Sequence, residues 1–253
     1  MKALDWLATS RRQAVRSVTK LAGLTACSHL VELENGERYV LRHQSERATN
    51  YGINYQQEVA FLRKLEPFGL SPTVVYADDN SALLNWIEGE IPDIFDEKLL
   101  KSLAEQLALL HTIPLQALDF EPKFATLDLA ERCLFLWNNL SQTKQRQLGF
   151  SPPFRQITPF QRAVCHHDIH LANLVLQEKQ LFLIDWEYAA ISDPALELAL
   201  LLQANALSAN QKEIFLAYYF AKTGFDSAAF LAKMEEYQPE VNKLSRLWFA
   251  LAE

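Results

Sequence analysis

Cysteine is scarce in this sequence, and its spacing excludes two kinds of stabilising centre. The three cysteines, Cys27, Cys133 and Cys165, lie far apart and form no C-x-x-C pair. A disulfide framework needs a denser pattern of cysteines, and a zinc ribbon needs them in pairs. The sequence therefore predicts a protein of a reducing compartment, without disulfides and without a zinc ribbon.

Long apolar runs and a signal peptide are also missing. The longest apolar stretches, such as Leu198–Leu202, fall far short of the roughly 20 residues that span a bilayer. Asp5 and Trp6 stand where a signal peptide would have an unbroken apolar stretch. No internal repeat or low-complexity tract is visible. We expect a cytoplasmic protein.

The sequence has no excess of positive charge. Lysine and arginine number 24 against 31 aspartates and glutamates, which gives a formal net charge of -7. An acidic surface argues against non-specific binding to nucleic acid or anionic membranes, and it is compatible with a cationic small ligand. We expect neither nucleic acid nor a membrane as a partner, and we infer no protein partner.

The first part of the chain contains most of the strand signals. Its first 20 residues predict a helix. Asn35-Gly36 separates two β-prone runs, Ala26–Glu34 and Arg38–His43, which is the strongest short-range signal for a hairpin. Apolar residues then recur at helical spacing from Asn54 to Leu65. Two further strands are predicted, at Val74–Ala77 and Ala82–Ile87.

The character of the sequence changes to mostly helix after Gly89. Asp93 or Asp96 can cap a helix with one apolar face. Ser208 and Gln211 have the spacing of a capping box that opens a helix ending at Gly224. An inserted hairpin is predicted from Leu174–Gln177 and Leu181–Ile184. We therefore expect an α+β fold with two lobes, a small antiparallel-sheet lobe over residues 1–88 and a larger helical lobe over 89–253.

One stretch of the helical part has the pattern of phosphoryl-transfer chemistry. His166-His167-Asp168-Ile169-His170-Leu171-Ala172-Asn173 contains H-x-D-x-x-x-x-N, and Asp185 ends the apolar strand that follows. Phosphoryl transfer requires a carboxylate to orient and deprotonate the attacking hydroxyl, and oxygen ligands that hold Mg²⁺ against the phosphates. The spacing supplies all three groups and predicts a kinase-type active site.

This segment resembles the catalytic core of the aminoglycoside phosphotransferase and choline/thiamine kinase superfamily, which is itself protein-kinase-like. Members of that superfamily carry H-G-D-x-H-x-x-N followed by I-D-[WF]-E. The resemblance implies a two-lobed kinase fold, Asp168 as catalytic base, and Asn173 and Asp185 as Mg²⁺ ligands. It also implies His166 as a brace of the loop, with Asp193 opening the family's D-P-x-x-[DE]-L-A helix. The run after Ile184 looks particularly similar to bacterial thiamine kinases and choline kinases.

The resemblance extends less sharply to the first lobe, where it implies an ATP site. Arg42 stands where the family places a basic residue on the ATP phosphates, and Glu58 is its candidate partner. The family more often has lysine at this position, but arginine keeps the charge and can contact two phosphate oxygens. Gly23 and Thr25 resemble a phosphate-covering turn. The backbone of Asn85, Trp86 and Ile87 would pair with adenine in the hinge.

The acceptor is predicted from the residues beside Asp185. Aromatic rings with a carboxylate suit a quaternary ammonium or thiazolium cation, and Trp186, Glu187 and Tyr188 offer them; the alternative is that they pack the lobe. His170 is the remaining candidate for acceptor binding. By resemblance, thiamine is the first expected acceptor, choline the second and an aminoglycoside the third.

Two other functions remain open. Arg42 in place of lysine allows a pseudokinase or a nucleotide-binding module without turnover. The histidines around Asp168 also allow a transition-metal site that catalyses hydrolysis, as in metal-dependent phosphoesterases. Such a site requires further His or Asp motifs, which this sequence lacks.

Overall fold

A computed structural model describes residues 2–21, 27–119 and 126–252 of this chain. The chain divides into two compact units, Met1–Glu88 and Gly89–Glu253. A five-stranded antiparallel sheet dominates the first unit, and helices dominate the second. The predicted α+β class, with a strand-rich first part and a larger helical second part, is confirmed.

The sheet of the first unit has the strand order β1-β2-β3-β5-β4. The predicted hairpin at Asn35-Gly36 joins β2 to β3, and Gly36 has φ 87°, a conformation that glycine adopts at little cost. The strands are β1 (Val15–Lys20), β2 (Cys27–Leu33), β3 (Arg38–His43), β4 (Val74–Ala77) and β5 (Ser81–Asn85).

Helices pack on both faces of this sheet. Ala3 and Leu7 of α1 are buried against one face, in a cluster that includes Leu41 and Leu83. Tyr55 and Val59 of α3 pack with Ala82 on the other face. Because side chains alternate along a strand, Arg42 points away from the face of Leu41 and towards α3. The helices are α1 (Lys2–Arg11), α2 (Glu46–Asn50), α3 (Tyr55–Leu65) and the short 3₁₀ turn η1 (Glu66–Phe68).

The prediction of a helix over the whole of the first 20 residues is wrong in its second half. The helix ends at Arg11, and Val15–Lys20 forms the edge strand β1, paired antiparallel with β2. Val15, Val18 and Thr19 are β-branched and favour a strand. The main-chain partners that β2 supplies decide the conformation of a segment whose own sequence signal is weak.

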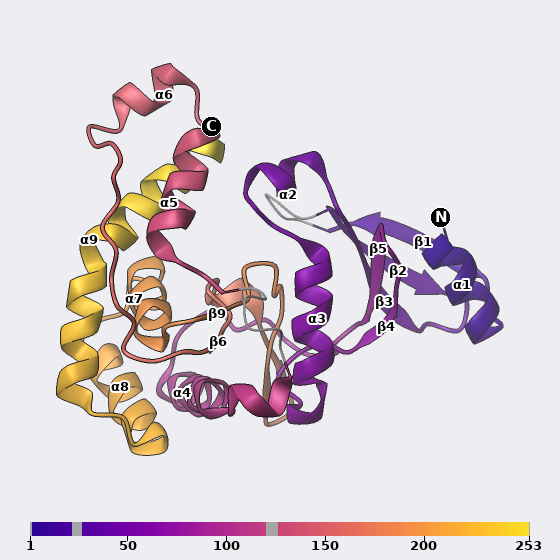
Figure 1. The fold of residues 1–253 in the computed structure, drawn as a ribbon. Helices are drawn as coiled ribbons and strands as arrows, with labels where there is room; N and C mark the ends of the chain where they lie inside the picture. The colour runs from indigo at the N-terminus through magenta and orange to yellow at the C-terminus, as the bar shows by residue number, and fades with distance from the viewer. Residues whose placement is uncertain (1, 22–26, 120–125, 253) are drawn as a thin grey trace. The chain divides into compact units, whose positions relative to one another are not determined.

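The second unit is built from helices that pack in pairs. Helix α4 packs on α8, and both α5 and α7 pack on α9 (Figure 1). Asp96 caps α4, and the predicted capping box of Ser208 and Gln211 opens α8, which ends at Gly224. The helices are α4 (Glu97–Thr112), α5 (Leu129–Asn138), α6 (Gln142–Gln147), α7 (Pro194–Ala204), α8 (Ala209–Thr223), α9 (Ser227–Ala252) and the 3₁₀ turns η2 (Leu115–Leu118) and η3 (Leu171–Asn173).

Two small antiparallel pairs of strands hold the segment with the kinase-type pattern. The predicted hairpin is formed by β7 (Leu174–Gln177) and β8 (Gln180–Leu183), and a second pair joins β6 (Ala163–Cys165) to β9 (Ala190–Ser192). The loop from β6 to η3 carries Asp168, and the turn from β8 to β9 carries Asp185. Strand pairing therefore fixes both ends of each loop.

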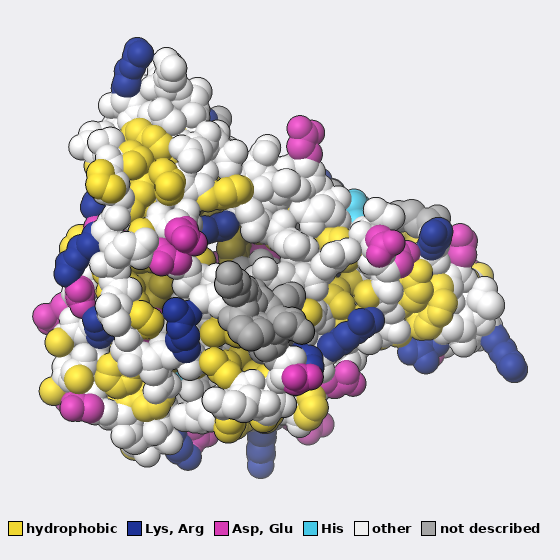
Figure 2. All heavy atoms as spheres, viewed as in Figure 1, with side chains coloured by type: hydrophobic (Ala, Val, Ile, Leu, Met, Phe, Trp, Pro, Cys, Tyr) yellow, Lys and Arg dark blue, Asp and Glu magenta, His cyan; other side chains and the backbone are white. Residues whose placement is uncertain are grey.

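Charged side chains of both signs are interspersed over the face shown in Figure 2, with apolar groups between them. No helix among the described residues combines the length and the apolar character that crossing a membrane requires.

Gly89 makes the closest backbone approach to the β7–β8 hairpin. Glu90 and Leu176 exchange two main-chain hydrogen bonds of 2.9 and 2.8 Å, and a Cβ atom at position 89 would overlap the Leu176 carbonyl group and the Val175 side chain. The lack of a side chain at Gly89 thus allows the chain to pair with β7.

We predict that Gly89→Ala destabilises the protein by about 1–3 kcal/mol, because the overlap forces the backbone to shift. Denaturant unfolding would measure the change. Gly36→Ala is the matched control, since an added Cβ there meets nothing within 4 Å and only the positive φ carries a cost, about 1 kcal/mol. Equal losses for both variants would contradict the packing argument.

Candidate active site

His166 joins the loop of Asp168 to the end of β8. Its Nδ1 accepts a hydrogen bond from the backbone N–H of Asp168 at 3.2 Å, and its Nε2 donates to the carbonyl of Ile184 at 2.9 Å. Burial lowers the pKa of His166, so the ring is neutral and holds the single proton that this arrangement needs. The His166 ring thereby ties Ile184, the residue before Asp185, to the backbone of Asp168.

Asp168 carries the carboxylate at the centre of the loop. Its Oδ2 accepts a hydrogen bond from Nδ2 of Asn173 at 3.0 Å and lies 3.6 Å from Nε2 of His170. The side chain is 33% exposed, so it can meet a molecule from solvent. The hydrogen bond with Asp168 raises the pKa of His170 against the opposing effect of burial.

Asn173 and Asp185 carry oxygen donors and are linked through the backbone of Ile184. The N–H of Ile184 donates to the carbonyl of Asn173 at 3.0 Å, which brings the two predicted metal ligands together. Because Nδ2 of Asn173 donates to both the carbonyl and the carboxylate of Asp168, its amide oxygen is the atom left to face a cation. Amide and carboxylate oxygens are hard donors of the kind that Mg²⁺ prefers, so this pair fits the ion.

Two residues of the site have a backbone conformation that glycine favours. His167 has φ 67° and Asp185 has φ 64°, which costs roughly 1–2 kcal/mol for a residue with a Cβ atom. Glycine stands at the position of His167 in the motif H-G-D that the sequence resembles. Residues in such conformations concentrate at functional sites, and here His167 immediately precedes Asp168 while Asp185 lies in the turn after β8.

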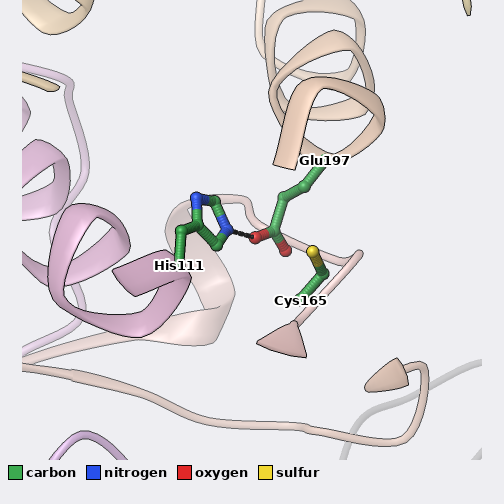
Figure 3. Close-up of side chains that lie close together, drawn as sticks. All are labelled: His111, Cys165 and Glu197. Carbon is green, nitrogen blue, oxygen red and sulfur yellow. Dashed lines mark hydrogen bonds and ion pairs between the residues drawn. The ribbon is translucent and has the colours of Figure 1, made fainter. Parts of the chain in front are cut away.

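The buried carboxylate of Glu197, near the start of α7, holds the backbone of the loop between β6 and η3. One oxygen, Oε1, accepts hydrogen bonds from the backbone N–H groups of His166 and His167, each at 2.6 Å. The other, Oε2, bonds to Nε2 of His111 at the end of α4. Figure 3 shows this carboxylate reaching from α7 to the His111 ring. His111 continues the chain of hydrogen bonds to the hydroxyl of Tyr219 at 2.7 Å.

The partners of Glu197 decide its charge. Burial alone would raise the pKa of Glu197, but the hydrogen bond and the charge of His111, together with the backbone N–H of His167, bring it to about 2. The carboxylate is therefore ionised at neutral pH although it is only 1% exposed.

His111, Cys165 and Glu197 are the described His, Cys and carboxylate residues that lie close enough together to hold a metal ion (Figure 3). They do not fit one well. Burial raises the pKa of the Cys165 thiol far above its usual value, and a metal needs the thiolate. Nε2 of His111 is already bonded to Glu197. Among the described residues, the histidines around Asp168 form no such cluster, so the hydrolytic alternative gains no support.

Asp193 acts where the helix α7 begins. Its Oδ1 accepts from the N–H of Ala195 at 3.0 Å, and its Oδ2 accepts from the N–H of Phe160 at 2.6 Å and from the hydroxyl of Tyr237 at 3.0 Å. These contacts cap α7 and connect it with α9, consistent with the bracing role expected for Asp193.

Three of the four residues expected to bind the acceptor follow Asp185, and they differ in burial. Trp186 is 1% exposed, donates through Nε1 to the Leu183 carbonyl at 2.8 Å and packs edge-on against His166. Glu187 is buried as well. Tyr188 is partly buried and accepts a hydrogen bond from Nε1 of Trp248 at 2.9 Å. The position of Trp186 favours packing over contact with an acceptor.

In the first unit, Arg42 and Glu58 form a buried ion pair. Nε of Arg42 lies 3.0 Å from a carboxylate oxygen of Glu58, and the side chains are 9% and 2% exposed. Strand β3 and helix α3 bring them together as the resemblance implies. Arginine at this position therefore makes the contact expected of a lysine.

Of the other residues expected in the ATP site, the structure describes Asn85, Trp86 and Ile87. Asn85 ends β5, and its side chain is bonded to Thr73. The N–H of Trp86 donates to the carbonyl of Arg38 at 3.3 Å, and the Arg38 guanidinium lies over the Trp86 ring. Ile87 follows in an irregular segment. Gly23 and Thr25 lie outside the described residues.

Sequence reasoning missed the anchor of the loop. His111 is not among the residues predicted for the site, and Glu197 enters the sequence analysis only as the acidic position of the D-P-x-x-[DE]-L-A motif that Asp193 opens. One signal for it is present in the sequence. Glu197 is the one charged residue in the apolar run of α7, and a buried carboxylate requires hydrogen-bonding partners.

Comparisons with known proteins agree with this geometry. The model of the phosphotransferase enzyme family matches residues 23–237. Over 184 residues the chain is 27% identical to Protein LicA of Haemophilus influenzae, covering 68% of this chain and 64% of that protein. Over 189 residues it is 28% identical to a thiamine kinase of Escherichia coli, covering 70% and 62%. The matches thus span less than two thirds of these relatives.

Solved structures share the fold of the chain. The choline kinase LicA of Streptococcus pneumoniae has a TM-score of 0.69 at 20% identity, with 99% of this chain and 98% of that chain covered. A structure of LicA in complex with AMP has a TM-score of 0.67 at 20% identity, with 99% and 97% covered. The predicted kinase-like fold class is confirmed by these likenesses.

We predict that Glu197→Gln destabilises the protein at neutral pH by about 3–5 kcal/mol, because the change leaves His111 and the loop without their buried ionic partner. A carboxyl whose folded pKa is lowered stabilises the protein above its usual pKa and loses that effect as pH falls. The difference from wild type should therefore shrink between pH 4.5 and about 2.

Denaturant unfolding at a series of pH values would measure this difference. The surface variant Glu235→Gln is the control and should stay within about 0.5 kcal/mol of wild type. A Glu197→Gln difference that is independent of acid pH would show that the carboxylate charge is not what anchors the loop.

A second pH dependence follows from His167. Burial lowers the pKa of His167 from 6.5 to about 4, so the unfolded chain binds a proton that the folded chain does not. The free energy of unfolding should therefore fall as pH decreases from 6.5 to about 4. His167→Asn keeps a residue that tolerates positive φ and should flatten this slope.

His170→Asn is the matched control with the opposite sign. The raised pKa of His170 gives stability that is present at low pH and lost as pH rises, and its partial exposure keeps the effect small. Identical slopes for wild type and His167→Asn would contradict the assignment to His167.

Proposed function

This chain belongs to the phosphotransferase enzyme family, as its sequence motifs predicted, and we propose that it transfers the γ-phosphate of ATP to a hydroxyl group of a small molecule. One observation carries the proposal. The carboxylate of Asp168, the amide of Asn173 and the strand end that bears Asp185 are held together by hydrogen bonds of 3.0 Å. That is the set of groups that phosphoryl transfer requires.

Asp168 acts on the acceptor in this proposal. Its partly exposed carboxylate orients the acceptor hydroxyl and receives the proton as the oxygen attacks phosphorus. The hydrogen bond from Asn173 fixes the direction of this carboxylate, and Nε2 of His170 lies 3.6 Å from it. Glu197 holds the backbone of His166 and His167, which precede Asp168. Asn173 and Asp185 would hold Mg²⁺, which when bound neutralises the charge of the phosphates.

The residues of the first unit are assigned to ATP. Arg42, oriented by Glu58 at 3.0 Å, would contact phosphate oxygens, since its guanidinium can donate two parallel hydrogen bonds. Backbone groups around Asn85, Trp86 and Ile87 would pair with adenine. We therefore propose residues 1–88 as the nucleotide-binding lobe and residues 89–253 as the lobe with the catalytic loop and acceptor site.

The names of the relatives give the first acceptors to test. A thiamine kinase and choline kinases resemble this chain, so thiamine and choline stand first and second, and an aminoglycoside third. Each of these molecules carries a hydroxyl group and a positive charge. The acidic net charge of the chain is compatible with such ligands.

We predict that the purified protein releases ADP from ATP in a manner that depends on both Mg²⁺ and a hydroxyl-bearing acceptor. Asp168→Asn should lower kcat by about 10²- to 10⁴-fold, the usual contribution of a general base, with little change in thermal stability. A coupled assay for ADP measures this loss, and the exposed Asp93→Asn is the control that should keep full activity.

Two outcomes would overturn the proposal. Turnover that survives Asp168→Asn would show that Asp168 is not the base. Mg²⁺-dependent binding of ATP without ADP release for any acceptor would favour the pseudokinase.

A further inference from the structure

The ring of Tyr188 is already covered by a cation of the protein itself. The guanidinium of Arg132, from α5, lies 5.9 Å from the centre of the Tyr188 ring and 5.8 Å from that of Phe135. This is the distance range of a cation–π contact. A thiazolium or quaternary ammonium group that approached this ring would therefore meet the positive charge of Arg132.

Tyr188 lies close to the reacting groups. It follows Asp185 by three positions, and its hydroxyl is fixed by Nε1 of Trp248 on α9 at 2.9 Å. Burial is the main reason that the pKa of Tyr188 is raised, and the charges of Glu187 and Asp168 raise it further. Strands β6 and β9 pair antiparallel up to Cys165 and Ala190, so Tyr188 stands two positions beyond the last pair, opposite the start of the loop that carries Asp168.

Arg132 has no anionic partner among the described residues. No carboxylate of those residues lies within ion-pair distance of it, and its contacts are the rings of Tyr188 and Phe135. Burial lowers the pKa of Arg132, but an arginine keeps its charge in a protein. A partly buried guanidinium with five donors and no carboxylate favours an anion from outside the chain.

His167 is a second polar group without a partner. Both of its ring nitrogens are buried and have no hydrogen-bonding partner among the described residues. In the register of β6 with β9, His167 and Tyr188 each stand two positions beyond the last pair, so His167 is close to the ring that Arg132 covers. A buried polar atom without a partner costs free energy, so a bound ligand or water that pairs with His167 would relieve that cost.

We propose that Arg132, with His167 near it, forms an acceptor subsite that binds an oxyanion, so that the acceptor carries a carboxylate or phosphate group besides its hydroxyl. This inference rests on the proposed function, and it changes the expected acceptor from a simple cation to an anion or zwitterion. Arg132 would bind the oxyanion with paired N–H donors. The same charge would repel choline and thiamine.

Three primary alcohols of similar size test the charge preference. They are 4-hydroxybutanoate, neutral 1,4-butanediol and cationic choline, with 4-hydroxybutyl phosphate added to separate carboxylate from phosphate recognition. For wild type we expect kcat/KM for one of the two anions to exceed that for the diol by about 10- to 100-fold, as a hydrogen bond to a charged group would give. Choline should be the poorest acceptor.

Variants at position 132 separate recognition from packing. Arg132→Gln should remove the preference by raising KM for the anion with kcat little changed, and Arg132→Glu should reverse it in favour of choline. Arg155→Gln, which changes an exposed arginine, should leave the order of acceptors unaltered. A purely structural Arg132 would alter thermal stability and lower kcat for all acceptors alike.

A binding measurement keeps the subsite and the proposed function distinguishable. Ligand-observed NMR of the same alcohols, with and without Arg132→Gln, reports binding whether or not turnover occurs. Equal binding of the anions and choline to wild type would overturn the subsite, even if ADP release supports the kinase. Selective anion binding without ADP release would support the subsite and refute the kinase. Turnover of choline that is unaffected by Arg132→Glu would also refute the subsite.

Discussion

The loop that carries Asp168, the proposed catalytic base, depends on the buried carboxylate of Glu197. Its two oxygens join the backbone of His166 and His167 to the His111 ring, so residues from β6, α4 and α7 meet at one charge. An ionised group in the interior is tolerated only when its hydrogen bonds are satisfied, and here each oxygen has a partner. The anchor lets the loop hold Asp168 at the surface although neighbouring backbone is in a conformation that costs free energy.

That cost is concentrated at His167 and Asp185, whose φ angles of 67° and 64° lie in the left-handed region. The chain can keep these conformations because several hydrogen bonds hold the surrounding backbone in place. His166 ties Asp168 to Ile184, and Ile184 is bonded to Asn173. These hydrogen bonds close a small network around the proposed Mg²⁺ ligands. Positioning of charged oxygens, rather than covalent chemistry, is what phosphoryl transfer asks of a protein.

The surroundings of Tyr188 bear on specificity in a different way. A bare aromatic ring beside Asp185 would favour a cationic acceptor, as the sequence led us to expect. Arg132 lies over that ring, and in the subsite that we propose it would give the acceptor a positive charge to meet. Family membership and fold are compatible with many acceptors, because specificity resides in side chains placed on a shared scaffold. The proposed subsite would therefore set the acceptor preference of this chain through a single arginine on α5.

The sequence by itself determined the fold class, the hairpins at Asn35-Gly36 and β7–β8, and the candidate catalytic residues, because turns, caps and the H-x-D-x-x-x-x-N spacing are local signals. It gave the wrong structure for Val15–Lys20, since an edge strand is decided by its neighbour β2. Only the tertiary structure revealed Glu197 with His111 and the position of Arg132 over Tyr188. These contacts join residues far apart in the sequence, and no local pattern determines which distant charges the fold brings together.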